Sequence, residues 1–253
     1  MTMPAAKSNA CFRPSRVRGL DWNDLNPTAI TMRILMTGAT GLLGQGVLHE
    51  ALANPAVSRI GVLGRRAPGS SDPRVEDLRV ERFDELDAIA ARLSPWDACF
   101  YCAGAPPIGT PEAEYRHVTL DLTLHVARAF ADRNPGARFL YVSGAHADPT
   151  SRLMPLKVKG ETEAALRTLS IRSVMLRPGG IQPAHGERSP HGWMRPMYAV
   201  GAPLMGLGVR LLPGLMTSTA AVGRAMLALA SMPDPPAVVE NKDINRLGTD
   251  APR

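Results

Sequence analysis

The sequence lacks several features that would assign it to a common class of proteins. No apolar run is long enough to cross a bilayer, because the Met- and Leu-rich stretch 197–209 is interrupted by Pro203 and several glycines. The N-terminal region lacks the apolar core of a secretory signal, which runs for roughly 7–15 residues. No basic run is dense enough to form a nucleic-acid stripe, although 29 basic and 23 acidic residues give a net charge of +6. These absences argue against export, a transmembrane segment and nucleic-acid binding.

Cysteine is also scarce, with three residues in the chain. Cys99 and Cys102 form a Cys-x-x-Cys within the strand-like run 97–102. Residues three apart on a strand face opposite sides of a sheet, so this pair is predicted to be neither a redox pair nor a metal site. We therefore expect reduced core thiols in a cytoplasmic protein.

Residues 1–31 differ in composition from the rest of the chain. They contain prolines, arginines and polar residues without a periodic apolar face, which predicts a disordered extension. Their Arg-rich, acid-poor composition leaves an organelle transit peptide as the alternative. Residues 32–253 are predicted to form a single domain, since a chain that is 45% hydrophobic can bury a full core.

Strand and helix patterns alternate along this domain. Such alternation predicts an α/β fold, a doubly wound parallel sheet with helices on both faces. The expected strands are 33–37, 59–63, 78–83, 97–102, 138–143, 173–177 and 237–240, and the expected helices are 42–53, 85–93, 111–133, 155–169 and 219–231.

A glycine-rich turn, residues 37–44, follows the first expected strand and opens the first expected helix. Gly38 is predicted to form the tight turn, Gly41 to let a diphosphate approach the backbone, and Gly44 to let the helix pack near the strand. A helix N-terminus placed there would bind an anion. The predicted cofactor-binding residues of this turn are Gly38, Thr40, Gly41, Leu42, Leu43 and Gly44.

The end of the second expected strand carries Arg65 and Arg66 where a carboxylate would select NAD. A guanidinium pairs well with a 2′-phosphate, so NADP is favoured over NAD, unless the two arginines only face solvent. Asp84 is a candidate partner for the adenine amino group, with an N-cap of helix 85–93 as the alternative.

Further motifs follow in a recognisable order: Cys102-Ala103-Gly104-Ala105, Tyr141-Val142-Ser143-Gly144, Lys159, and Leu176-Arg177-Pro178-Gly179. With the glycine turn they resemble the extended and atypical short-chain dehydrogenases, in the NAD(P)-dependent epimerase/dehydratase branch. The chain is similar to the compact subgroup of Tat-interacting oxidoreductase-like proteins. The resemblance spans about residues 32 to 247 and implies a Rossmann-type fold with a small C-terminal substrate cap.

The resemblance also implies an active site. In that family a serine, a tyrosine and a lysine four residues after it act together, and Ser143 and Lys159 match the serine and the lysine. The tyrosine position holds Pro155. The implied function is an NAD(P)-binding oxidoreductase acting on an unknown carbonyl or hydroxyl compound; a non-catalytic NAD(P)-binding regulator or sensor is the alternative. The further cofactor-binding residues are Cys102, Ala103, Gly104, Lys159, Pro178 and Gly179.

Another side chain would have to supply the proton that Pro155 cannot. His146 is the predicted catalytic candidate because it is nearest to Ser143, and Tyr198 and His185 are alternatives. His117, Asp121 and His125 share one helix face, but the ligand set is too small, so no metal is predicted.

The segment around 180–218 is expected to form the substrate cap. Its apolar residues are expected to pack on the core or to line a pocket for an apolar small-molecule substrate, and a lid for a membrane surface or a partner is the competing interpretation. A protein partner or a homodimer stays open at this point.

Overall fold

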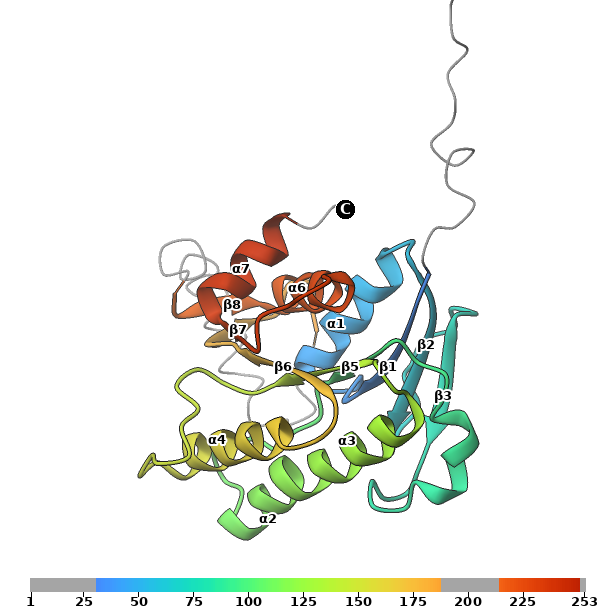
Figure 1. The fold of residues 1–253 in the computed structure, drawn as a ribbon. Coiled ribbons are helices and arrows are strands. Elements are labelled where there is room, and N and C mark those ends of the chain that lie inside the picture. The colour runs from blue at the N-terminus through green and yellow to red at the C-terminus, as the bar shows by residue number, and fades with distance from the viewer. Residues whose placement is uncertain (1–30, 188–213, 251–253) are drawn as a thin grey trace, which may run out of the picture. The chain divides into compact units, whose positions relative to one another are not determined.

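The computed structural model describes residues 31–187 and 214–250. Its centre is a seven-stranded sheet in the order β3-β2-β1-β4-β5-β6-β9, and every pairing is parallel (Figure 1). The strands are β1 (Met32–Thr37), β2 (Val57–Gly64), β3 (Val75–Arg79), β4 (Ala98–Tyr101), β5 (Arg138–Val142), β6 (Arg172–Arg177) and β9 (Val238–Glu240). The order reverses between β1 and β4, and in such sheets ligands bind outside the carboxyl ends of the strands at this point.

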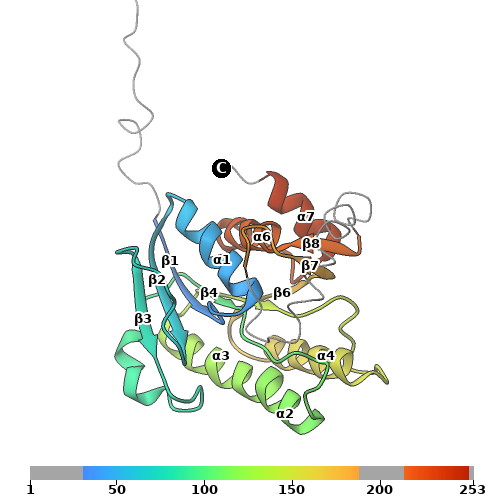
Figure 2. The ribbon, with the colours of Figure 1, turned by 180° about the vertical axis from the view of Figure 1, so that it is seen from behind.

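Helices cover both faces of the sheet, as the sequence predicted. Figures 1 and 2 show α1, α6 and α7 on one side and α2, α3 and α4 on the other. Ile34 and Met36 of β1 belong to the core cluster beneath α1 and α6, whereas Leu35 belongs to the opposite cluster beneath α3. The helices are α1 (Leu42–Ala53), α2 (Glu112–Arg116), α3 (Leu122–Arg133), α4 (Met154–Arg167), α6 (Thr219–Ser231) and α7 (Asn241–Asp250).

Several predicted boundaries differ from the structure. The third strand is β3, so the prediction of 78–83 was displaced toward the C-terminus. β3 lies at the sheet edge, where charged residues are tolerated, and its Glu76 pairs with Arg59 of β2 and Arg92. The predicted helix 85–93 is a short 3₁₀ helix, η1 (Asp87–Arg92).

The predicted helix 111–133 is helical but not uniform. α2 and α3 are joined by one wide π turn, η2 (His117–Asp121). Two strands and one helix were missed: β7 (Gly180–Gln182) and β8 (Met216–Ser218), which pair in a small parallel sheet, and α7. Residues 1–30 and most of the predicted cap, 188–213, lie outside the described residues, so both assignments remain predictions. No described helix has the length and apolar character needed to span a bilayer.

Candidate active site

The turn between β1 and α1 depends on two of its glycines. Gly38 has a φ of 71°, and a Cβ there would lie 2.6 Å from the Ala103 nitrogen, so this turn packs directly on the turn after β4. At Gly44 a Cβ would lie 2.0 Å from the Gly38 carbonyl oxygen. Gly41, the N-cap of α1, is less restricted, because its Cβ would lie 3.2 Å from that oxygen. The small size of Gly41 therefore fits the predicted approach of a diphosphate.

A cavity of about 320 Å³ opens beside this turn, at the carboxyl ends of β4, β5 and β6. It brings together seven predicted residues: Cys102, Ala103, Gly104, Ser143, Lys159, Pro178 and Gly179. Its other lining residues are Ala105, Pro107, Tyr115, Thr119, Tyr141, Val142, Gly144 and Ile181. The cavity thus lies on the β4 side of the point where the strand order reverses, next to the glycine turn that packs on Cys102 and Ala103.

Lys159 reaches the cavity from α4. Its Nζ donates a hydrogen bond to the Ser143 carbonyl oxygen and lies 5.9 Å from the centre of the Tyr141 ring. A Cβ on Gly144 would lie 3.3 Å from Lys159 Cδ, so a larger residue would crowd this path. Burial lowers the pKa of the Lys159 ammonium to about 8, and the nearby Glu163 charge opposes this shift. Lys159 is therefore a hydrogen-bond donor whose charge responds to pH slightly above neutral.

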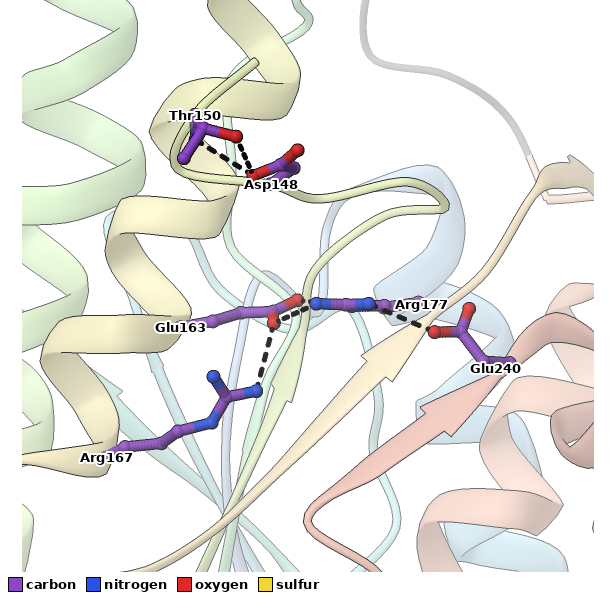
Figure 3. A network of polar contacts seen from close by, with 6 residues as sticks. All are labelled: Asp148, Thr150, Glu163, Arg167, Arg177 and Glu240. Atoms are coloured by element: carbon purple, nitrogen blue, oxygen red, sulfur yellow. Dashed lines mark hydrogen bonds and ion pairs between the residues drawn. The ribbon is translucent and has the colours of Figure 1, made fainter.

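Loops on either side hold this arrangement together. Ser143 N donates to the Leu176 carbonyl at 2.8 Å, and Ala145 N donates to the Pro178 carbonyl at 2.9 Å. The loop after β5 is thereby fixed to the end of β6 and the turn that follows it. One helical turn after Lys159, Glu163 connects α4 to the end of β6 through Arg177, a contact that Figure 3 shows.

Four hydroxyl groups of the cavity wall are buried without a hydrogen-bond partner among the described residues. They belong to Tyr115, Thr119, Tyr141 and Ser143. Each of these residues is at most 4% exposed. Buried polar groups are rarely left unpaired, so this concentration marks a place where a ligand or water would be bound. Ser143 was predicted, whereas Tyr115 and Tyr141 were missed, although Tyr141 precedes Ser143 by two residues and so lies on the same side of the strand.

Pro155 lies in the first turn of α4. A proline is well accommodated there, because its missing N–H would have no partner inside the helix. The position that carries the family's tyrosine therefore supplies no proton in this chain.

The predicted ribose-selecting arginines differ in their contacts. Arg66 Nη2 donates to Thr40 Oγ1 at 3.0 Å, so Arg66 reaches across to the glycine turn. Arg65 is exposed on the strand end. Asp84 is held by Arg82, which lowers its pKa to about 2. The N-cap of η1 is Leu86, so the alternative role of Asp84 as a helix cap was wrong.

The predicted proton donors lie away from the cavity lining or outside the described residues. His146 is exposed on a left-handed turn with a φ of 61°, and it is not among the lining residues. His185 Nε2 lies 2.8 Å from Glu50 Oε1 on α1. Tyr198 falls in 188–213, which is not described. The catalytic role of His146 stays a prediction.

The Cys99 and Cys102 thiols point to opposite faces of the sheet, as predicted. Cys99 belongs to the core cluster beneath α3, and Cys102 packs against the cluster beneath α1. Burial raises the pKa of the Cys102 thiol to about 12, so it stays protonated.

One trio among the described residues has the ligand types of a metal site: His49, Glu50 and His185. The two imidazole rings stack at 3.8 Å, and Glu50 already pairs with His185 and Arg224. These contacts account for the trio without an ion. His117 and Asp121 lie on the surface with 3.5 Å between Nδ1 and Oδ2.

Comparison with known proteins identifies the class of cofactor. The sequence profile of the NAD dependent epimerase/dehydratase family matches residues 34–167, more than half of the 253 residues. The matched segment contains the glycine turn, Ser143 and Lys159. This match confirms the predicted resemblance and a nicotinamide dinucleotide as the cofactor, while the preference for NADP stays a prediction.

Two fungal relatives are similar over the same part of the chain. Protein fmp52 of Emericella nidulans is 31% identical over 166 residues, 62% of this chain and 70% of its own length. Protein FMP52 of Eremothecium gossypii is 34% identical over 165 residues, 63% of this chain and 70% of its own. Both names carry the word mitochondrial, and they contradict the predicted cytoplasmic location. That prediction was wrong because scarce cysteine and a missing secretory core exclude only the secretory route.

Solved structures confirm the predicted fold class. Uronate dehydrogenase from Agrobacterium tumefaciens superposes with a TM-score of 0.60 at 16% identity, over 87% of this chain and 84% of its own. UDP-glucuronic acid 4-epimerase from Bacillus cereus, solved with NAD, gives a TM-score of 0.59 at 17% identity, over 82% of this chain and 77% of its own. At such identities the likeness concerns the fold alone.

Proposed function

The chain belongs to the NAD dependent epimerase/dehydratase family, and from this premise we propose that it is an NAD(P)-dependent oxidoreductase acting on a small carbonyl or hydroxyl compound. One observation carries the proposal. Lys159 and Ser143 line a single cavity beside a glycine turn in which Gly41 is less crowded than Gly38 and Gly44. A cofactor site and a candidate reaction site are thus adjacent.

In this proposal α1 and Lys159 bind the cofactor, and Ser143 binds the substrate. The first turn of α1 binds the diphosphate through its backbone N–H groups, since the positive end of the helix dipole lies there. Lys159 donates hydrogen bonds to the nicotinamide ribose hydroxyls, and Ser143 donates one to the substrate oxygen. The bound cofactor supplies or accepts the hydride, and the protein's share is to orient the substrate and exclude water.

The coenzyme is proposed to be NADP in preference to NAD. Arg66 is the basis of this preference, because its guanidinium contacts Thr40 in the glycine turn. A 2′-phosphate near this position would accept charge-assisted hydrogen bonds from the guanidinium. The apolar residues of the cavity lining, among them Pro107, Val142 and Ile181, favour an apolar substrate.

The test is a titration of the purified protein with NADPH and NADH, followed by nicotinamide fluorescence. We expect saturable binding that is tighter for NADPH and lost in Gly41→Asp, because the new carboxylate repels the diphosphate. Ala53→Asp is the matched control, since it adds the same charge at the exposed far end of α1. Absence of binding by the wild-type protein would refute the proposal.

A second function is favoured by Pro155. A protein without the family's tyrosine can bind the dinucleotide and act as a non-catalytic regulator of a protein partner or of a second copy of itself. Tight cofactor binding without reduction of any aldehyde, ketone or quinone in a broad panel would favour this function. Turnover of any such compound, lost in Lys159→Met, would favour the oxidoreductase.

A further inference from the structure

Tyr115 places a phenol in the cavity wall from a direction that the family's motif does not use. It lies on α2, is 0% exposed, and lines the same cavity as Ser143 and Lys159. Its hydroxyl has no hydrogen-bond partner within residues 31–187 and 214–250. A phenylalanine would fill the same space without leaving a buried hydroxyl unpaired. The hydroxyl is therefore better explained by contact with a ligand than by stability.

Tyr141 is the competing phenol, and its surroundings are those of a core residue. Its ring packs against Tyr101, with centroids 6.1 Å apart, in the cluster beneath α3. Burial raises the pKa of Tyr141 well above its usual value. Burial raises the pKa of Tyr115 too, so the direction of the pKa shift does not separate the two phenols. Tyr115 belongs to neither core cluster, and of the two phenols it is therefore the better placed to exchange a proton.

We propose that Tyr115 exchanges the proton with the substrate oxygen, in the role that Pro155 cannot fill. This inference rests on the proposed oxidoreductase function. In the direction of reduction, the bound dinucleotide would supply the hydride to the carbonyl carbon, and the Tyr115 O–H bond would break to give the carbonyl oxygen its proton. The proton forms the new hydroxyl of the product, and the phenolate recovers a proton from solvent through the Lys159 ammonium. Oxidation of a hydroxyl follows the same steps in reverse.

The charges around Tyr115 suit this exchange. Lys159 on α4 is the cationic group that lines the cavity with it, and Tyr141 on β5 is the second ionisable group. On α4, Glu163 pairs with Arg177 and Glu161 pairs with Arg116. On α2, Glu112 and Glu114 are exposed, whereas Tyr115 is buried. A phenol that is protonated at neutral pH and shares its cavity with an ammonium can donate its proton as the substrate oxygen becomes negative.

An NMR titration tests the inference without turnover. The chain has four tyrosines, so 13Cζ-tyrosine signals can be assigned with single Tyr→Phe variants. We expect NADP⁺ to lower the pKa of Tyr115 by roughly one unit, because a positive nicotinamide ring near the phenol favours the phenolate. The Tyr101 signal should be unaffected. If NADP⁺ is bound and the Tyr115 signal does not respond, the inference is wrong. If NADP⁺ does not bind, the proposed function itself fails, which is a different result.

Kinetics with 9,10-phenanthrenequinone and 4-nitrobenzaldehyde as probe carbonyls give a second readout. Tyr115→Phe should keep the wild-type melting temperature and NADPH affinity but lower kcat by about 100-fold, a typical loss for a general acid. Tyr101→Phe, a buried phenol outside the cavity lining, is the control. Adding Pro155→Tyr to Tyr115→Phe should restore kcat. Wild-type kcat in Tyr115→Phe would overturn the inference, and where neither probe is reduced the NMR titration decides.

Discussion

Glu163 and Arg177 form a two-pronged ion pair that joins α4 to the end of β6. Arg177 Nε donates to Glu163 Oε1 at 2.9 Å, and its Nη2 donates to Oε2 at 2.7 Å. Glu163 is 1% exposed, and Arg167 and Glu240 extend the network on either side (Figure 3). Because Lys159 lies one helical turn before Glu163, and Pro178 directly follows Arg177, the pair fixes two walls of the cavity relative to each other.

Glu163→Gln should lower the free energy of unfolding by about 3–5 kcal/mol, because it removes the buried carboxylate and leaves Arg177 only the exposed carboxylate of Glu240. Glu161→Gln is the matched control on the same helix. Its ion pair with Arg116 is more exposed, so its loss should cost at most about 1 kcal/mol. Urea denaturation of both variants measures the difference. Equal effects would show that the buried pair has no special role in stability.

The glycine turn offers a pair of substitutions with opposite readouts. In Gly44→Ala the new Cβ would lie 2.0 Å from the Gly38 oxygen, so the backbone must shift and the protein should lose about 1–3 kcal/mol of stability. In Gly41→Ala the new Cβ lies 3.2 Å from that oxygen, a tight contact that a small backbone shift relieves, so the fold should be retained. Its affinity for NADPH should fall about tenfold or more, a difference of about 1.4 kcal/mol. Thermal melting and fluorescence titration of each variant separate the two effects. Wild-type NADPH affinity in Gly41→Ala would contradict the predicted diphosphate contact.

Much of this site could be predicted because local sequence determines it. The Gly38 turn, the strand end at Ser143 and the first helical turn at Pro155 are each specified by residues within a few positions. The alternation of strands and helices then places the carboxyl ends of β4, β5 and β6 at one edge. The cavity follows from this topology, and so do seven of its lining residues.

The features that were missed depend on contacts between distant segments. No spacing rule relates Tyr115 on α2 to Tyr141 on β5, so only the folded chain brings their hydroxyls to one cavity. The start of the edge strand β3 is hard to recognise in the sequence because Glu76 is charged. In the folded chain this charge is paired with Arg59 and Arg92. α7 is polar on most of its surface, and its position depends on Gly248 packing against Ala221 of α6.

Arg66→Ala should weaken NADPH binding about tenfold and leave NADH binding nearly unchanged. A hydrogen bond to a charged group contributes about 1.5–3 kcal/mol, and Arg66 is oriented toward the glycine turn by Thr40. Arg65→Ala is the matched control, since it removes the same charge from the adjacent exposed position. Dissociation constants for both coenzymes in both variants provide the measurement. If Arg65→Ala weakened NADPH binding more than Arg66→Ala, the 2′-phosphate contact would belong to Arg65 and the prediction would be wrong.

Lys159 should give pH effects of opposite sign on stability and on cofactor binding. Its pKa is about 8 in the folded protein and 10.5 in an ordinary environment, so between these values the unfolded chain binds more protons. Its contribution to the free energy of unfolding therefore rises with pH across this window. The ammonium is the form that donates to the ribose hydroxyls, so NADPH affinity should fall as pH rises through about 8.

Lys159→Met distinguishes these two pH effects from those of the other titrating groups of the protein. The variant should lose the pH-dependent part of NADPH binding near pH 8 and bind more weakly at pH 7. It should also lose the rise in stability toward pH 10.5. Lys157→Met, at an exposed position on the same helix, should keep both wild-type profiles. Fluorescence titrations and denaturation across this pH range measure both quantities. A Lys159→Met protein with the wild-type binding profile would show that the ammonium does not contact the cofactor, since no other described lining residue carries a titrating charge near pH 8.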